Sequence, residues 1–177
     1  YNATDYNSNI SIVGNQSNGT TNVTAIPPGS GDPGIVVAAG GGTPNITSVT
    51  VSGNTLTSHN RVVLDAAAGC INLSYADYVV ITGNTLSGFG GQGIAISSPI
   101  LGAIISTNTI ANTINAGGQN NGIRFTSAAT GAQISMVGNH LKTMTYGYNY
   151  ALGMTTTNIY TINTLCLSIT TSCVVGP

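Results

Sequence analysis

The sequence carries very little charge. It contains no Glu and no Trp, and charged residues make up only 4% of its 177 residues. Three basic side chains cannot form a surface that neutralises a phosphate backbone, so the composition argues against nucleic-acid binding. No apolar run approaches the length of a transmembrane helix, and no membrane span is expected. Good helix formers are scarce, which argues against long amphipathic helices.

Apolar residues are nevertheless abundant, at 41% of the chain. Disordered chains are usually charged and poor in such residues, so an ordered core is expected. The length suits one domain. We expect a single domain over 1–177, with an exposed N-terminal segment at 1–9, recognisable repeats over 10–165 and a C-terminal edge strand at 166–177.

One short phrase recurs along the chain. It is clearest in VTVSGNTL (49–56), VVITGNTL (79–86) and AIISTNTI (103–110). Apolar residues stand five and three positions before its asparagine and two positions after it, which is the period of a strand with one buried face. In the last copy, this alignment predicts that Tyr160 and Leu165 point inward. The repeated asparagines lie 24 to 39 residues apart, at Asn15, Asn54, Asn84, Asn108, Asn139 and Asn163.

A second phrase follows each copy of the first. In it, too, alternate residues are apolar, and Tyr148 and Tyr150 take the inward positions of its last copy. Clusters of Gly, Asn and Ser between the phrases are typical of turns. The copies read GIVV (34–37), RVVL (61–64), GIAI (93–96), GIRF (122–125) and GYNY (147–150).

A repeat near 24 residues with variable insertions indicates a solenoid, in which each turn buries its apolar face against its neighbours. The expected fold is all-β, a single-domain parallel β-helix of about six coils. The asparagines would stack at an inward corner as a ladder, with each amide bonding to the next and satisfying polar groups that the turn buries.

These residues resemble a known family. The strand-Gly-Asn-Thr-Leu phrase is similar to the repeat of the right-handed parallel β-helix, or pectate lyase-like, superfamily, which includes polysaccharide lyases and hydrolases, phage tailspikes and surface adhesins. The resemblance covers residues 10–165 and implies the fold. It implies little about activity, because the fold hosts many functions.

Enzymes of that superfamily use clustered acidic residues. This chain offers four aspartates, of which Asp65 and Asp77 could approach each other across a coil, with Arg61 nearby. Both aspartates also suit turns, where a short carboxylate caps backbone amides. His59 and His140 lie beside no nucleophile and are expected to face the surface. We therefore expect no catalytic residue, no metal ligand and no cofactor.

The composition points to an extracellular location. Cys166 and Cys173 are close enough in sequence to form a disulfide in an oxidising compartment, which would leave Cys70 as a buried hydrophobic residue. Asn-x-Ser/Thr sequons arise by chance in a chain this rich in these residues, or they mark glycosylation. The candidate glycosylation sites are Asn2, Asn9, Asn15, Asn18, Asn22, Asn45 and Asn72.

Two further patterns suggest surface roles. Thr55, Thr85 and Thr109 each follow a repeated asparagine, and outward ranks of Thr on a flat, uncharged face are what an ice-binding surface requires. The alternative is that Thr simply favours exposed strands. Tyr146 is a candidate for stacking on a sugar, although core or rim packing is the simpler role for this tyrosine cluster.

Neither end of the chain shows a capping helix or a run of charge. The last stretch, LCLSITTSCVVGP, is apolar, uncharged and strand-like. Open strand edges favour pairing with another subunit. The leading hypothesis is a non-enzymatic structural subunit of a surface filament or adhesive fibre, with itself as partner. The alternative is a tailspike-like shaft that binds a surface glycan or receptor; a polysaccharide lyase or hydrolase is a third possibility.

Overall fold

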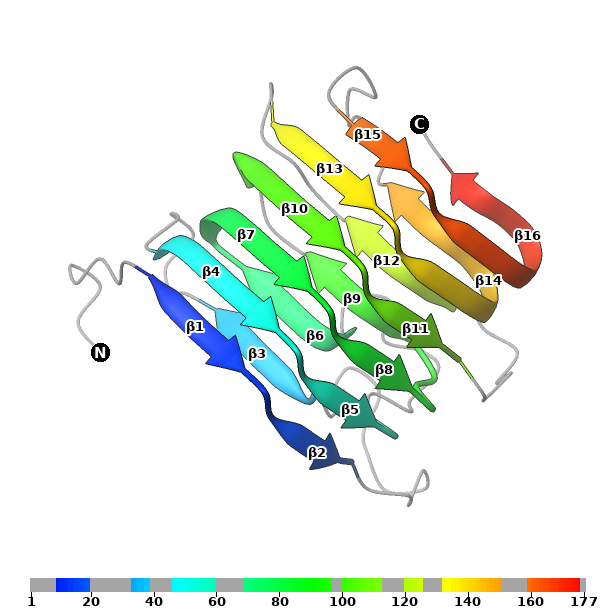
Figure 1. The fold of residues 1–177 in the computed structure, drawn as a ribbon, viewed down its shortest axis with the longest axis horizontal. Helices are drawn as coiled ribbons and strands as arrows, with labels where there is room; N and C mark the ends of the chain where they lie inside the picture. Colours follow the sequence, from blue (N-terminus) through cyan, green and yellow to red (C-terminus); the bar gives the residue numbers. More distant parts are fainter. Residues whose placement is uncertain are drawn as a thin grey trace.

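The fold is all-β in the part of the chain that the structure, a computed structural model, describes. That part comprises residues 9–19, 33–38, 46–59, 69–96, 100–112, 120–125, 132–150 and 159–175. Every strand pair in it is parallel, and the strands form two curled sheets (Figure 1). No helix that could cross a membrane occurs in these residues.

The first sheet has six strands, and each comes from one copy of the first phrase. Their spatial order is their order along the chain. From one edge to the other they are β1 (Ile10–Val13), β4 (Ile46–Ser52), β7 (Ala76–Thr82), β10 (Gly102–Ser106), β13 (Gln133–Val137) and β15 (Ile159–Ile162).

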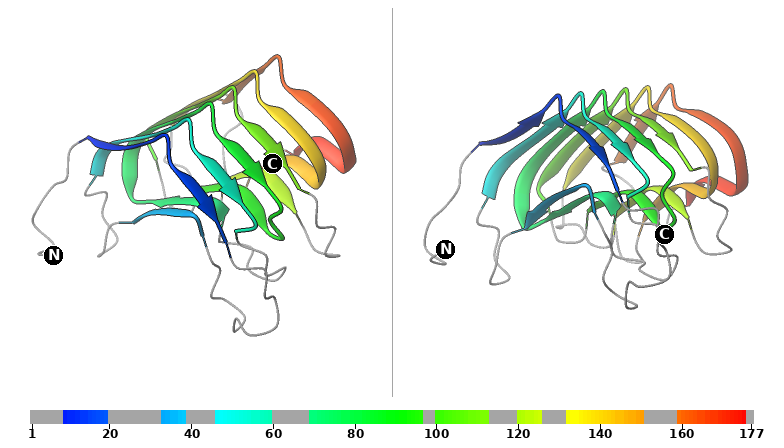
Figure 2. Two further views of the ribbon diagram at one scale, coloured as in Figure 1. Left: turned by 60° about the horizontal axis from the view of Figure 1, so that its bottom comes forward. Right: turned by 90° about the horizontal axis from the view of Figure 1, so that it is seen from below.

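The second sheet has ten strands, of which nine form a continuous path with two limbs and the tenth, β16, pairs with β14 off this path. The short limb follows the repeated asparagines and contains β2 (Gln16–Asn18), β5 (Thr55–Thr57), β8 (Thr85–Ser87) and β11 (Thr109–Ala111). The other limb contains β3 (Ile35–Ala38), β6 (Gly69–Ser74), β9 (Gln92–Ile96) and β12 (Asn121–Phe125). The limbs merge in β14 (His140–Tyr150), which pairs with both β11 and β12 and also with β16 (Leu165–Val175). Figure 2 shows β14 and β16 curving round at one end of the fold.

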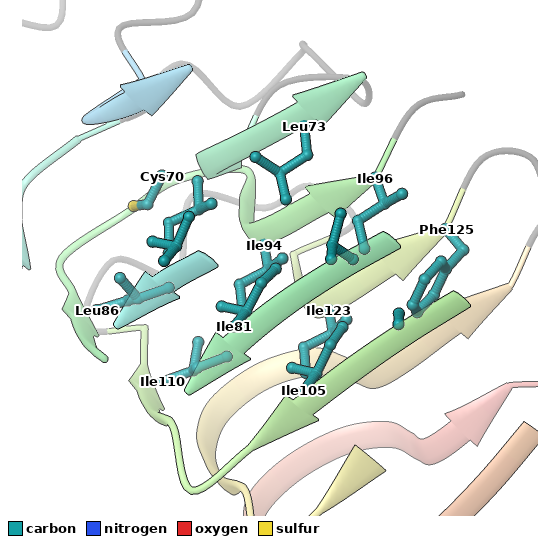
Figure 3. Packing of buried hydrophobic residues seen from close by; sticks show 14 of the residues in the cluster. Cys70, Leu73, Ile81, Leu86, Ile94, Ile96, Ile105, Ile110, Ile123 and Phe125 are labelled. Carbon is teal, nitrogen blue, oxygen red and sulfur yellow. The ribbon is translucent and has the colours of Figure 1, made fainter. Parts of the chain in front are cut away.

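The core lies between the first sheet and the two limbs of the second. Alternate residues of the phrases supply it, as the period of two predicts: Ile81 and Ile105 of the first sheet meet Ile94 and Ile123 of the second (Figure 3), and all four are fully buried. Tyr148 and Tyr150 also lie inside, as predicted, and the Tyr150 ring stacks on Phe125 with centroids 5.9 Å apart.

The glycines that begin the second phrase allow the two limbs to approach closely. A Cβ at Gly93 would lie 2.6 Å from Ile110 Cγ2 of the short limb, and one at Gly122 would lie 2.7 Å from the carbonyl oxygen of Gly147 in the paired strand β14. Real Cβ atoms do not make such contacts, so these positions exclude any side chain.

One second-phrase strand differs from the prediction. The stretch RVVL (61–64) lies outside the described residues, and its place in the sheet is taken by β6, whose Ile71 pairs with Ile94 and whose Leu73 pairs with Ile96. The sequence INLS (71–74) carries the same apolar alternation as RVVL, so the period of two does not distinguish them.

The last copy of the first phrase is shifted by one residue from the predicted alignment. Val137 pairs with Ile162, and His140 pairs with Leu165, so Asn163 stands beside Gly138 and Thr164 stands beside Asn139. A shift of one residue exchanges the faces of a strand. Tyr160 and Leu165, predicted to be buried, are therefore exposed, and Ile159 and Cys166 pack against the core instead.

Candidate functional site

The asparagines of the first phrase form a buried ladder at the bend between the two sheets. The backbone N–H of Asn54 and its Nδ2 both donate to Asn84 Oδ1, at 3.0 and 2.9 Å. Asn84 donates in the same way to Asn108, and Asn108 to Asn139. At the first step, Asn15 donates twice to Asn54.

Each internal asparagine has all of its side-chain hydrogen-bonding groups satisfied. Its Oδ1 accepts two bonds from the preceding asparagine, and its Nδ2 donates to the next Oδ1 and to a carbonyl of the preceding repeat. For Asn84 that carbonyl belongs to Val51, at 2.9 Å, and Asn84 Nδ2 also donates to Thr82 O at 3.2 Å. An amide supplies both donors and acceptors, which a carboxylate or a hydroxyl does not provide in this combination. The repeated residue is thus fixed by hydrogen-bond chemistry.

The backbone before each ladder asparagine has a positive φ. Glycine occupies this position in four copies, with φ of 63° at Gly53 and 64° at Gly83. Thr107 takes it with φ 54° and Asn163 with φ 52°. Asparagine is among the non-glycine residues that tolerate this region best, which explains why Asn163 fits the glycine position rather than the ladder position predicted for it.

Tyr148 and Thr164 complete the ladder where the sixth asparagine was expected. Asn139 Nδ2 donates to the Tyr148 hydroxyl at 3.3 Å, and that hydroxyl lies 2.7 Å from Thr164 Oγ1. Burial raises the pKa of Tyr148, against a smaller opposing effect of these hydrogen bonds, and burial also raises the pKa of Tyr150. Both side chains are therefore neutral structural groups at ordinary pH.

A second buried polar cluster was not predicted. Asn121 Nδ2 donates to Gln92 Oε1, and Asn149 Nδ2 donates to Asn121 Oδ1 at 2.9 Å. Asn112 and Asn120 are buried as well. Gln92 and Asn121 stand at the same register position immediately before the second-phrase glycine. That shared place in the repeat is the signal that sequence analysis could have used.

The candidate acid–base residues do not form a catalytic group in the described part of the chain. Asp65 and Arg61 lie outside it. Asp77 is half-buried in β7, and its backbone carbonyl accepts a bond from Leu101 N–H at 2.8 Å. No group of three metal-ligating side chains occurs among the residues that the structure describes.

The histidines do not both face the surface. His59 was expected to be exposed but is only 5% exposed, because its ring packs beside Gly19 and Gly34 and its Nε2 lies 3.1 Å from Ser17 Oγ. His140 is half-buried in β14. The His59 Nδ1 is buried and has no hydrogen-bond partner among the described residues, and the location of His59 five residues after Asn54 gave no sign of its burial.

The cysteines pair as the sequence suggested. Cys166 and Cys173 form a disulfide within β16, while Cys70 is free and buried.

The sequons differ in their surroundings. Asn2, Asn22 and Asn45 lie outside the described residues, whereas Asn9 and Asn18 are exposed. Asn15 is also exposed, but its Nδ2 donates to both Val13 O and Asn54 Oδ1, so a linked sugar would replace a hydrogen that the ladder uses. Asn72 is half-buried, with its Oδ1 enclosed and unpartnered. The geometry thus favours Asn9 and Asn18 among the described sequons.

The row of aligned, exposed threonines on the short limb contains only three members in the described part of the chain. Thr55, Thr85 and Thr109 are aligned and exposed, and the next two residues in the row are His140 and Leu165. A bulky ring and an apolar side chain interrupt the regular array of hydroxyls that ice binding requires.

The outer face of the first sheet contains a hollow of about 620 Å³ across β7, β10, β13 and β15. Tyr78 and Tyr160, which both line it, are 56% and 59% exposed. Gly102 pairs with Tyr78 on one side and with Gln133 on the other, so the sheet lacks a side chain between them. Leu101, Ile104 and Ser135 also line the hollow. We call this feature the outer groove.

Comparison of the chain with family models, with curated proteins and with solved structures finds no match in any of the three.

Proposed function

We propose that the protein is a non-enzymatic, extracellular structural subunit: a parallel β-helix of about six coils that joins copies of itself end to end into a fibre. The observation that carries this proposal is that the first and last strands of both sheets have unpaired, uncharged edges in the described part of the chain. They present complementary hydrogen-bonding groups that have no partner among the described residues, and none of their side chains is charged.

The strand order supports the β-helix. The chain visits the first sheet, the short limb and the other limb in the same sequence in each of four passes, and in two later passes the limbs merge into β14 and β16. Repetition of one path, with equivalent strands paired in parallel, is the arrangement that stacked coils produce. The phrase that resembles the pectate lyase-like superfamily supports the same interpretation.

The ladder gives the two ends complementary groups. At each internal step the earlier residue donates its N–H to the later Oδ1, and the residue after the later asparagine donates its N–H to the earlier carbonyl, as Thr85 does to Asn54 at 2.8 Å. In the described residues, nothing donates to Asn15 Oδ1 and the Thr164 N–H has no acceptor. In a fibre, Thr164 N–H would donate to Asn15 of the next copy, and Gln16 N–H would donate to the carbonyl of Thr164.

Exposed strand edges are normally protected by charged side chains or proline. Strands β1, β2 and β3 contain neither, nor do β15 and β16 at the other end. The whole chain has a formal net charge of only −1, so electrostatic repulsion between copies is small. Both features favour edge-to-edge addition.

The proposed location follows from the surface and the disulfide. Hydroxyl and amide groups hydrate the chain in place of charges, and disulfides such as Cys166–Cys173 persist mainly in oxidising compartments.

A proline at the free edge tests the proposal. The N–H groups of Asn15 and Gly19 point toward β5, so that of Gln16, between them in the alternation, points away from it. Gln16→Pro would remove the donor from the joint without removing an internal bond, and Gln16→Ala is the matched control. Sedimentation velocity over a concentration series should show assembly of the wild type and Gln16→Ala, and single chains of 17.8 kDa for Gln16→Pro. A wild type that stays a single chain, or a proline variant that assembles equally well, contradicts the proposal.

A further inference from the structure

We propose that the outer groove binds an uncharged oligosaccharide that lies across β7, β10, β13 and β15. This inference is independent of end-to-end assembly, because the groove lies on the face of the first sheet and not at its edges.

The groove has the size of a small-ligand site. Its volume of about 620 Å³ falls in the range of pockets that hold small molecules. Strands β10 and β13 lie between Tyr78 on β7 and Tyr160 on β15, so the two residues are three strand spacings apart, or roughly 14 Å across the sheet. That length suits a short sugar chain better than one monosaccharide.

The absence of a side chain at Gly102 creates the floor of the groove. A Cβ there would lie 3.0 Å from Cδ1 and 3.3 Å from Cε1 of Tyr78, so the tyrosine ring lies over the glycine. The ring is held at the bottom of the groove while more than half of its surface stays open to solvent. An exposed aromatic ring in a fixed position is a suitable surface for the C–H face of a sugar ring.

Polar groups without charge flank the aromatic rings. Gln133 stands beside Gly102, and Ser135 stands between Ile104 and Tyr160, so an amide and a hydroxyl are available to sugar hydroxyls. Among the described residues, no Asp, Glu, Lys or Arg lines the groove. A charged ligand would lose its hydration without gaining an ion pair, which favours a neutral one.

A peptide strand is a poorer occupant. Strand β10 is paired on both sides, by β7 and β13, so the floor of the groove has no free backbone edge to which a peptide could add. A flat protein partner would need a wide apolar contact, whereas here Gln133 and Ser135 interrupt the apolar residues. Alternating aromatic and neutral polar groups match the alternating C–H and O–H groups of a sugar chain.

The test uses hexasaccharides of known composition. Isothermal titration with neutral hexamers of glucose in α and β linkages, of mannose and of N-acetylglucosamine should give binding to at least one of them. Tyr78→Ala and Tyr160→Ala should each weaken that binding about tenfold or more. Gly102→Ala should also weaken it, because the added methyl group displaces the Tyr78 ring. Tyr78 and Tyr160 are exposed, whereas Gly102 is buried beneath the Tyr78 ring, so thermal unfolding of each variant verifies that the fold is retained.

Ile162→Ala is the matched control, because Ile162 is equally exposed on the same sheet but does not line the groove. It should leave the dissociation constant unchanged. The proposal is overturned if none of the neutral hexamers binds at millimolar concentration, if binding survives all three groove variants, or if a galacturonic acid hexamer binds more tightly than every neutral one.

Discussion

Asn84 Oδ1 accepts two hydrogen bonds from one residue, Asn54, whose backbone N–H lies 3.0 Å away and whose Nδ2 lies 2.9 Å away. The two residues are 30 positions apart in the sequence and both are buried. A single amide oxygen thus fixes the register of adjacent repeats and satisfies two donors that the bend would otherwise bury unpaired.

The first prediction concerns the isosteric change Asn84→Asp. It removes the Nδ2 donations to Val51 O and Asn108 Oδ1 and places a carboxylate against those two acceptors. The free energy of unfolding at neutral pH should fall by about 3–5 kcal/mol, measured by chemical denaturation.

The control for this change is Asn15→Asp at the exposed end of the ladder, which should cost less than about 1 kcal/mol. The buried carboxyl group of the Asn84→Asp variant should have a raised pKa, so the stability deficit of that variant should shrink as the pH is lowered and the neutral acid forms. An equal loss at both sites, or a deficit that does not depend on pH, would contradict the role given to the ladder.

The second prediction concerns backbone strain before the ladder asparagine. Thr107 is β-branched and has φ +54°, a conformation that such residues rarely adopt. Thr107→Gly relieves this strain but removes the hydroxyl bonds to Thr82 and Ser106. The net effect should be an increase of about 1 kcal/mol in the free energy of unfolding.

The converse change is Gly83→Ala. A Cβ at Gly83 has room, with its nearest neighbour 3.9 Å away, so any loss reports the backbone conformation alone. We expect a loss of about 1–2 kcal/mol by thermal or chemical unfolding. If Thr107→Gly is destabilising and Gly83→Ala neutral, the positive φ is not the reason for glycine at this position.

The third prediction concerns the close packing of Gly122 in β12 against the neighbouring strand β14. Gly122→Ala would place a methyl group 2.7 Å from Gly147 O and 2.8 Å from Met144 Sδ. The free energy of unfolding should fall by about 3 kcal/mol, because a paired neighbouring backbone cannot move aside easily. Gly102→Ala, whose new methyl group approaches no atom closer than 3.0 Å and meets the exposed Tyr78 ring first, should cost less than about 1 kcal/mol. Similar losses at both positions would argue against the packing role of Gly122.

The fourth prediction concerns alkaline pH. Burial raises the pKa of Tyr148 and Tyr150 above the ordinary value of 10.0, so above that pH the unfolded chain loses these protons before the folded chain does. The contribution of the two neutral tyrosines to the free energy of unfolding is complete below about pH 10. It is lost as the pH rises toward their pKa values in the folded chain. The slope should approach about 1.4 kcal/mol per pH unit for each tyrosine. Urea unfolding between about pH 9 and pH 11.5 measures this slope of the free energy of unfolding against pH, and Tyr150→Phe should reduce the slope.

Much of this architecture follows from the period of two in the first phrase and from the repeated Asn. Ile81 and Leu86 could be placed in the core from sequence because each strand has one buried face, and the ladder followed from the amide group's dual capacity. Gln92 and Asn121 were missed because their partnership depends on alignment of the second phrase, which is less regular.

The sequence alignment was wrong in the last copy of the first phrase, where one residue type suits two positions of the repeat. In the last copy, Asn163 satisfies either the ladder position or the positive-φ position, and the presence of an Asn suggested the former. The three-dimensional packing selects the latter, since Ile159 and Cys166 then face the core. The outer groove could not be predicted because Tyr78, Gly102 and Tyr160 come from three different repeats and their exposure depends on register.

The most direct test of the proposed fibre is electron cryomicroscopy of the assembled protein. The six strands of the first sheet, spaced by about 4.8 Å, predict an axial repeat per subunit of roughly 29 Å and a meridional reflection near 4.8 Å. Filaments with both spacings are the expected result. Discrete particles of one or a few chains at every concentration, or filaments without the axial spacing of about 4.8 Å, would contradict end-to-end stacking of coils.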